Sequence, residues 1–278
     1  SMKTNEVVNQ AITYIMKHID ESITIEDVAE HCHFSKYYFS RIFKNETGES
    51  IYGFIKRLKL EQSAFRLKVE RERTITDIGF DYGYCPSNYS QVFKKHHNES
   101  PIEFRNNIFQ HSVNHPFYPH AQVNIESFEE CSRKISIETI KDQFVIYERR
   151  IGNYNELIEK WAEFTDKYKK YIDEKTVFLE RTFDDPSITS ADKCIYDICM
   201  TVDKNCYVEN TCVIPGGKFA VYHYKGFPEQ IYTAYQNMFQ VWFPVVKKRI
   251  DNRYGFDIYN KIDCDSMYME LDICIPIK

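Results

Sequence analysis

The sequence predicts two domains: an all-α module built from a duplicated helix-turn-helix unit, followed by an α+β domain with internal pseudo-twofold symmetry. Three observations lead to this fold class. Residues 25–54 align without a gap on residues 75–104, at an offset of 50. Helical spacing of apolar residues gives way near Ile135 to short β-type runs. A second repeat, at an offset of 74, relates the two halves of the region that follows.

Each copy of the first repeat is typical of a short helix, a turn and a longer helix. Thr24 and Thr74 each precede an Asp by three residues, as in the capping box that starts a helix. Apolar residues recur at i, i+3 and i+4 in the longer helix and predict a buried stripe. The stripe consists of Phe39, Ile42 and Phe43 in the first copy and of Tyr89, Val92 and Phe93 in the second.

The opposite face of each longer helix is polar or cationic. Such side chains suit hydrogen bonds to base edges and phosphates in a major groove. A solvated helix face is the alternative, and duplication of the same residue types at the same offset argues against it. The candidate DNA-binding residues are Lys36, Tyr37, Ser40, Arg41 and Lys44 in the first copy and Ser87, Ser90, Gln91 and Lys94 in the second.

Charge is distributed unevenly along the 278 residues. The net charge is −5, which by itself disfavours a nucleic-acid binder. Residues 36–110, however, hold 13 Lys and Arg against 9 acids, whereas the flanking regions are acidic. The excess of positive charge therefore falls on the part of the chain that holds the repeated helices. An opening helix at Asn5–His18 and a long connecting helix at about Ile51–Leu67 complete the predicted module.

These residues resemble the AraC/XylS family of transcription regulators over roughly residues 5–108. The resemblance implies seven helices, with the connecting helix holding two recognition helices in successive major grooves, and it implies promoter DNA and RNA polymerase as partners. It rests on residues 75–78, Gly83 and Tyr84, Phe93 and Lys94, Ser100 and Pro101, Phe104 and Arg105, and, in the first copy, Phe34 and Ser35, residues 39–41, Phe43 and Lys44, and Thr47 and Gly48.

Three positions depart from the pattern of this family. His33 replaces the usual Gly of the first turn, and the second turn is one residue shorter than the commonest form. Asn98 stands where Gly closes the second recognition helix. Because Asn tolerates the left-handed conformation, we expect the helix to end there.

The predicted boundaries are residues 2–108 for the DNA-binding module, 109–134 for a linker and 135–278 for the second domain. The linker holds two Pro and has little periodicity. Metal ligation can be imagined for His111, His115, His120 and Cys131, but no spacing fixes their geometry, so we expect solvated histidines. The nine Cys are scattered and indicate reduced thiols. We therefore predict no metal and no cofactor.

The second domain alternates β-type runs with two amphipathic helices. Its predicted strands are 135–140, 144–149, 195–202, 217–224, 256–259 and 267–275, and its helices are 155–170 and 228–247. At the offset of 74, Gly152 falls on Gly226, Leu157 on Ile231 and Trp161 on Tyr235. Two such halves facing each other predict a cleft between them.

An acid among aromatic residues marks the candidate ligand site. Asp257 and Tyr259 share one face of their strand, because side chains alternate along a strand. A buried acid needs a partner, and a ligand cation stacked on aromatic rings would be one. For each aromatic residue ordinary core is the alternative, and for Glu270 a solvated strand face. The candidate ligand-binding residues are Tyr147, Trp161, Tyr222, Tyr224, Asp257, Tyr259 and Glu270.

This half of the chain resembles the GyrI-like effector-binding domains, over about residues 136–278. The resemblance implies a pocket for small compounds, often aromatic and cationic, with a carboxylate inside; Asp257 stands for the Glu of the family's Phe-Glu-x-Tyr motif. Arg150 replaces a family His and would repel a cation. The matching residues are 149–154, 184–189, Tyr196 and Asp197, 214–218, 256–259 and 271–277.

Together the two halves predict a cytoplasmic, one-component transcription regulator that senses a small molecule. No apolar run approaches the length of a membrane span. Two alternatives remain: a small-molecule hydrolase fused to a DNA-binding module, with Glu270 as its acid, because some GyrI-like domains hydrolyse reactive compounds; and a DNA-architectural protein whose second domain only docks partners. No nucleophile–base arrangement can be placed, so we predict no catalytic residue.

Overall fold

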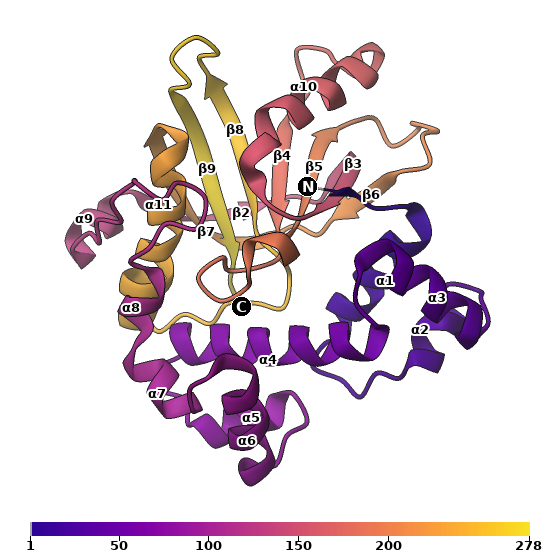
Figure 1. Ribbon diagram of the computed structural model, residues 1–278. Coiled ribbons are helices and arrows are strands. Elements are labelled where there is room, and N and C mark those ends of the chain that lie inside the picture. The colour runs from indigo at the N-terminus through magenta and orange to yellow at the C-terminus, as the bar shows by residue number, and fades with distance from the viewer. Residues whose placement is uncertain (1) are drawn as a thin grey trace. The chain divides into compact units, whose positions relative to one another are not determined.

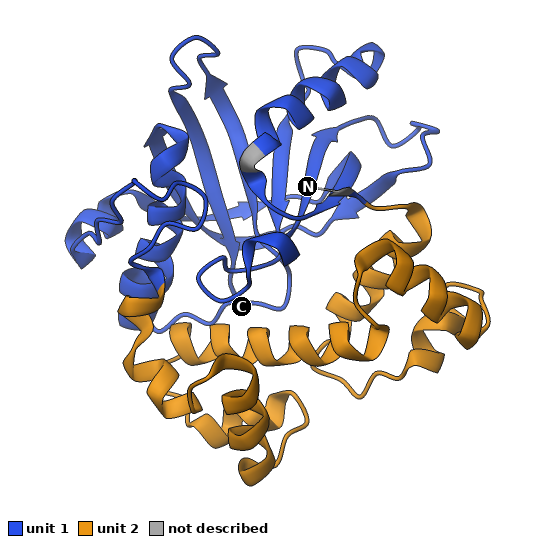
Figure 2. Cartoon of the chain, in the orientation of Figure 1, with its two compact units in different colours: residues 1–3, 112–278 blue, residues 4–111 orange. Residues whose placement is uncertain are grey.

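The computed structural model describes residues 2–278, which divide into two compact units. Residues 4–111 form the helical unit, orange in Figure 2. Residues 112–278, together with a short strand at residues 2–3, form the sheet unit, blue in Figure 2. Among the described residues, no helix combines the length and the apolar character that crossing a bilayer requires.

The helical unit repeats its own elements at the predicted offset (Figure 1). Both short helices have 7 residues and both recognition helices have 12, and each second copy begins 50 positions after the first. The duplicated helix-turn-helix is therefore confirmed. The helices are α1 (Glu6–Lys17), α2 (Ile25–His31), α3 (Lys36–Thr47), α4 (Ile51–Val69), α5 (Ile75–Asp81), α6 (Pro86–His97), α7 (Pro101–Asn106) and α8 (Ile108–Ser112), of which Ser112 belongs to the sheet unit.

Local chemistry explains where these helices start and stop. The Thr24 hydroxyl accepts from the Asp27 amide while the Asp27 carboxylate accepts from the Thr24 amide, which confirms the first capping box. Asn98 adopts φ 62° and closes α6, as expected, just as Gly48 closes α3 at φ 79°. His33, in the first turn, has φ 61°. A non-glycine residue therefore takes the left-handed conformation at two of these positions.

The sheet unit is built on one antiparallel sheet (Figure 1). Its strand order is β1-β3-β5-β4-β8-β9-β7-β2, and β6 pairs with β3. Strands β1, β4 and β6 lie where the sequence predicted none. The strands are β1 (Met2–Lys3), β2 (Ile135–Ile140), β3 (Gln143–Ile151), β4 (Phe178–Thr182), β5 (Ile195–Thr201), β6 (Thr211–Ile214), β7 (Gly217–Gly226), β8 (Phe256–Ile262) and β9 (Met269–Pro276).

The helices of the sheet unit follow the second repeat. Helix α10 (Leu157–Lys167) and helix α11 (Ile231–Asn237) begin at equivalent positions, 74 residues apart. Each comes after a strand that ends at a Gly with positive φ or directly before one. The predicted helix at 228–247 is not continuous, because α11 passes into a π-helical turn (Met238–Trp242) and then α12 (Phe243–Val246). The strand order places β4 and β8 side by side at the centre, where the two halves meet.

The segment expected as a linker is partly helical and partly buried. It contains α9 (Phe128–Arg133), which starts at a capping box. The expectation of solvated histidines is wrong for His115, which is 5% exposed. Its Nδ1 accepts from the amides of Phe117 and Tyr118, and its ring packs on Tyr232. Within residues 2–278, no group of three His, Cys, Asp or Glu is placed to hold a metal ion.

Candidate functional sites

Helix α3 presents the first set of candidate DNA-binding side chains to solvent. Phe39 and Phe43 are fully buried against the unit, so the remaining faces of the helix point outward. Tyr37 is 78% exposed, and Arg41 and Lys44 are exposed as well. Lys36 forms an ion pair with Glu26 at 2.6 Å. Ser40 is half-buried and donates its hydroxyl to the Lys36 carbonyl at 2.7 Å, which leaves its lone pairs for a partner.

Helix α6 presents the second set in the same way. Tyr89 and Phe93 are buried, and the four candidates Ser87, Ser90, Gln91 and Lys94 are exposed. Close packing holds this helix against α5: a Cβ on Gly79 would lie 2.7 Å from the Tyr89 ring, which shows that only Gly fits there. The Tyr89 hydroxyl also donates to Ser63 of α4 at 2.9 Å.

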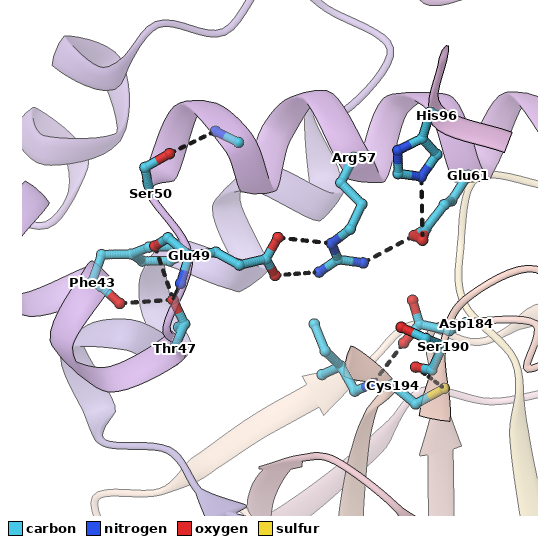
Figure 3. Close-up of polar contacts among 12 residues, drawn as sticks. Phe43, Thr47, Glu49, Ser50, Arg57, Glu61, His96, Asp184, Ser190 and Cys194 are labelled. Carbon is cyan, nitrogen blue, oxygen red and sulfur yellow. Dashed lines mark hydrogen bonds and ion pairs between the residues drawn. The ribbon is translucent and has the colours of Figure 1, made fainter. Parts of the chain in front are cut away.

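A network of polar contacts around the buried Arg57 and Glu61 ties the scaffold of the two recognition helices together (Figure 3). Arg57 of α4 donates two hydrogen bonds to Glu49, at 2.8 and 2.9 Å, and a third to Glu61 at 2.9 Å. Glu61 in turn lies 3.8 Å from His96 of α6. Since Glu49 follows α3 directly, the network connects the end of the first recognition helix to the second through α4.

A second candidate site is a pair of buried carboxylates at the centre of the sheet. Glu180 of β4 and Asp257 of β8 are register partners on adjacent strands, and each is 3% exposed. Directly opposed residues of an antiparallel pair have Cβ atoms about 4.5–5.5 Å apart. Among the described residues, neither acid forms an ion pair with Lys, Arg or His, whereas the buried Asp197 is paired with Arg149 at 2.8 Å. The structure therefore places two acids together without a cation.

Aromatic donors surround this pair. The Tyr235 hydroxyl donates to Asp257 Oδ1, and the Tyr259 hydroxyl donates to Glu180 Oε2 at 2.9 Å. Trp161 Nε1 also donates to Glu180 Oε2, at 3.4 Å, and its ring meets that of Tyr259 edge-on. All three rings are half-buried, so they keep some contact with solvent while the acids do not.

The electrostatics of the pair follow from burial. Loss of water raises the pKa of Glu180 to about 7, against the opposing effect of hydrogen bonds from Tyr259 and Trp161. Burial, and then the charge of Glu180, raise the pKa of Asp257 well above its usual value. Two adjacent carboxylates in a low-dielectric site do not both ionise readily. The pair would be stabilised by a proton or by a cation.

The remaining predicted ligand residues lie elsewhere. Tyr147 belongs to the apolar cluster on the opposite face of the sheet, with Phe256. Glu270 alternates with Leu271 and points to that same opposite face, where it accepts from the Tyr268 hydroxyl.

Two further predicted tyrosines lie on the face of Asp257 but on β7. This strand is two strands away from β8, about 10 Å at the usual strand spacing. The Tyr222 hydroxyl donates to Glu126 at 2.5 Å, and the Tyr224 hydroxyl donates to the Phe227 carbonyl.

Sequence reasoning missed Glu180 and Tyr235. Strand β4 was not predicted, so Glu180 had no assigned face. Tyr235 did carry a signal: it is the counterpart of Trp161 in the 74-residue repeat, and in the structure each of these two residues donates to one acid of the pair. Each half of the repeat thus contributes one acid and one of these two donors.

Comparisons with known proteins agree with this two-part layout. A family model described as a GyrI-like small molecule binding domain matches residues 133–278, and a helix-turn-helix domain model matches residues 28–107. Regulatory protein SoxS of Escherichia coli (strain K12) is 30% identical over 108 residues, which are 38% of this chain and 100% of SoxS. The chain belongs to the AraC family of transcription regulators and carries a GyrI-like domain.

Three further proteins are similar to all or part of this chain. Transcriptional regulator Rob of Salmonella typhimurium (strain LT2) is 27% identical over 100 residues, which are 36% of this chain and 34% of Rob. The solved C-terminal domain of AraT, a response regulator from Geobacillus stearothermophilus, is 33% identical, with 37% of this chain and 86% of that one covered and a TM-score of 0.35. A cryo-EM structure of an EcmrR–DNA complex is 15% identical, with 91% and 98% covered and a TM-score of 0.45.

The family assignment gives the function of each half. The AraC-type half is a DNA-binding module, and the GyrI-like half is a small-molecule binding domain. The chain is therefore a DNA-binding transcription regulator with an effector domain.

Proposed function

We propose that this regulator reads promoter DNA with the exposed faces of α3 and α6, and that its GyrI-like domain senses a small aromatic cation through the Glu180–Asp257 pair. The observation that carries the effector proposal is the pair itself: two register-matched, buried acids without a cationic partner among the described residues, next to half-buried aromatic rings. A desolvated cation gains both charge compensation from the acids and cation–π contact from the rings.

Arg150 does not oppose this proposal strongly. It lies on β3, opposite Tyr196 of β5, so two strand spacings, about 10 Å, separate its strand from β4. A cation bound at the pair favours the ionised form of the acids, so that negative charge then lies directly at the proposed site. Attraction from the nearer charges therefore outweighs repulsion from the more distant guanidinium.

The DNA proposal rests on the exposure and charge of the repeated faces. The candidate residues are Lys36, Tyr37, Ser40, Arg41 and Lys44 on α3 and Ser87, Ser90, Gln91 and Lys94 on α6. Two helices on one rigid scaffold would occupy successive major grooves of a single site. Residues 2–108 would form this module and 135–278 the effector domain. We propose RNA polymerase as a further partner and the cytoplasm, where promoter DNA is accessible, as the place of action.

We propose that the chain binds its effector without chemical change. The rival is hydrolysis, and it is favoured by one observation: Glu180, with its pKa raised to about 7 beside Tyr and Trp donors, has the properties of a general acid. Glu270, the acid first considered, lies on the other face of the sheet. Incubating the full chain with a reactive cyclopropane compound would separate the two: a product peak that Glu180→Gln abolishes would establish hydrolysis.

Isothermal titration of the full chain tests the effector proposal. The probes are benzyltrimethylammonium and its neutral isostere neopentylbenzene, which differ by the charge of one atom. Asp257→Asn keeps the shape of the site and removes a charge, so it should weaken the cation about tenfold or more, while the neutral probe changes little. Glu270→Gln, on the opposite face, is the matched control and should change neither affinity. Equal affinity of wild type and Asp257→Asn for the cation would remove Asp257 from the site.

A further inference from the structure

Helix α11 contacts the carboxylate pair on one side. On another side it contacts residues 112–134, the segment that leads from the helical unit to β2. Tyr235 donates to Asp257, and its hydroxyl lies 3.5 Å from that of Thr182 on β4. The next residue, Gln236, is fully buried and donates to Asp185 at 3.1 Å. A movement of the Tyr235 side chain would therefore act on α11, whose next residue, Gln236, is held by a hydrogen bond to Asp185.

Helix α11 and the π-helical turn that follows it hold this segment at two points. Gln240, one turn after Gln236, donates to the Ser112 hydroxyl at 2.5 Å and to Gln236 Oε1 at 2.9 Å. Asn237 exchanges hydrogen bonds with Glu126 at 2.9 and 2.8 Å. Ser112 is the first residue of the sheet unit after the helical unit and the last residue of α8. In the preceding residue, His111, the ring stacks on Phe104 of the helical unit at 4.7 Å.

The helix is wider than an α-helix where it reaches Gln240. Residues 238–242 form a π-helical turn, in which the Phe243 amide donates to the Met238 carbonyl. Pro244 explains this turn: it has no amide to donate to the Gln240 carbonyl, and its ring would clash with that carbonyl in an α-helix. π-helical turns are rare and occur mostly within α-helices, frequently at functional sites.

Within residues 2–278, the side-chain amide of Gln240 also lacks one of its hydrogen bonds. Among the described residues, Gln240 Oε1 is buried without a hydrogen-bond partner. A buried acceptor without a hydrogen-bond partner destabilises the arrangement that contains it. An arrangement that satisfies this oxygen would recover that cost and so offset the loss of the hydrogen bond to Ser112. Such a near-balance is what a two-state element requires.

We propose that α11 and its π-helical turn couple occupation of the carboxylate pair to helix α8, through Tyr235 at one end and Gln240 at the other. The proposal rests on the effector function proposed above. A cation that binds Asp257 breaks the hydrogen bond between Asp257 and the Tyr235 hydroxyl. Helix α11 then shifts, and Gln240 gives up its hydrogen bond to Ser112 for another partner. Since α8 carries the chain out of the DNA-binding unit, this is a direct covalent route for the effector signal.

Hydrogen exchange of the full chain, followed by mass spectrometry, tests the coupling without any ligand. Tyr235→Phe keeps the ring and removes the hydroxyl. The amides of 238–242 and of 108–112 should then exchange about tenfold faster, because both segments lose a fixed neighbour. Tyr224→Phe is the matched control: it removes a buried hydroxyl that donates to a backbone carbonyl of the same unit. It should leave both segments unchanged.

A second variant tests the direction of coupling. Gln240→Met keeps the length of the side chain and removes its hydrogen bonds. When Tyr235→Phe is added to Gln240→Met, exchange should still rise in 238–242, with no further change in 108–112. The proposal is overturned if Tyr235→Phe leaves 108–112 unchanged, or if its full effect on 108–112 persists in the Gln240→Met background.

Benzyltrimethylammonium, added to wild type, distinguishes this proposal from the one on which it rests. The coupling predicts the exchange pattern of Tyr235→Phe. If the variants behave as expected but the cation changes nothing, the effector class is wrong and the coupling stands. If the cation binds by calorimetry and 108–112 do not respond, the coupling is wrong and the effector class stands.

Discussion

The two units place their charges in opposite ways. The helical unit displays Arg41 and Lys44 on an exposed helix, whereas the sheet unit buries Glu180 and Asp257 in the middle of a sheet. An exposed cation keeps its water and meets the DNA phosphates at little desolvation cost, so its contribution is screened by salt. A buried acid has already lost its water and responds instead to protons and to desolvated cations. The same molecule can therefore have one interface controlled by salt and another controlled by pH and effector.

Buried ionisable groups extend the contrast to stability. In the helical unit, burial and the neighbouring His96 lower the pKa of His97 to about 4. In the sheet unit, burial raises the pKa of Glu180 to about 7. Both groups are neutral in their favoured folded form, but acid charges the first and alkali charges the second. The stability of the two units should therefore change with pH in opposite directions.

The largest expected effect is destabilisation of the sheet unit as the pH rises from acid to neutral. Because the folded pKa of Glu180 lies above its unfolded value, its contribution is complete at acid pH and is lost as pH rises through about 7. The free energy of unfolding should fall by about 2–3 kcal/mol between pH 5 and 8. Urea denaturation monitored by Trp fluorescence measures the unfolding of this unit, because both Trp residues lie in it. Glu180→Gln should flatten the profile; a profile that keeps its full slope in the variant would show that another group titrates.

Acid destabilisation of the helical unit should be of similar or slightly smaller size. His97 packs on Phe93, and its Nε2 lies 3.3 Å from the Leu60 carbonyl oxygen. Its folded pKa is below the unfolded value, so stability is complete above about 6.5 and falls by about 2 kcal/mol as pH drops toward 4. The counterpart of His97 in the first copy is Thr47. In His97→Thr, the hydrogen exchange of α6 amides should no longer report a loss of stability at low pH. If that loss persists in the variant, His97 is not the group that causes it.

A smaller effect is expected for the exposed faces. Arg41 stands where the second copy has Gln91, so we expect α3 to contribute more to specificity. Arg41→Ala should weaken binding to a selected DNA site by about 1–3 kcal/mol if it reads a base, and Gln91→Ala should weaken it less. Binding would be measured by fluorescence anisotropy of labelled DNA at matched salt. Equal, small losses for the two variants would contradict the asymmetry.

The smallest effect should come from the exposed starts of the same two helices. The Ser35 hydroxyl caps α3 by accepting from the Tyr38 amide at 3.3 Å, whereas Cys85 makes no side-chain cap on α6. Cys85→Ser should therefore stabilise the helical unit by about 0.5–1 kcal/mol, and Ser35→Ala should destabilise it by a similar amount. Thermal unfolding monitored by circular dichroism measures both. A loss of stability in Cys85→Ser would show that Ser cannot reach the amides there.

The exposed faces of α3 and α6 were predictable, because the local spacing of apolar residues identifies the buried side of a helix. Phe39 and Phe43 identify the buried side of α3, and the 50-residue repeat carries that reading to α6. The carboxylate pair was only half predictable. Asp257 has a recognisable motif, but Glu180 stands 77 positions earlier in a five-residue strand next to Arg181, where adjacent charges obscure the alternation. Register between distant strands, which brings the two acids together, is not a local property of sequence.

The π-helical turn shows the same limit within a helix. Apolar spacing predicted one helix over residues 228–247, and Pro244 lies within that range. The spacing did not reveal that the ring of Pro244 would widen the preceding turn rather than end the helix. The consequence for Gln240 and Ser112 depends on contacts that only the folded chain displays.

Hydroxyl-radical footprinting of the full chain, on DNA selected from a random library, tests the central claim most directly. Two unequal recognition helices on one scaffold predict a single asymmetric site, with two protected major-groove segments one helical turn apart. Arg41→Ala should weaken sequence preference in one segment and leave the other intact. A palindromic site, read by one helix of each of two subunits, would contradict the account.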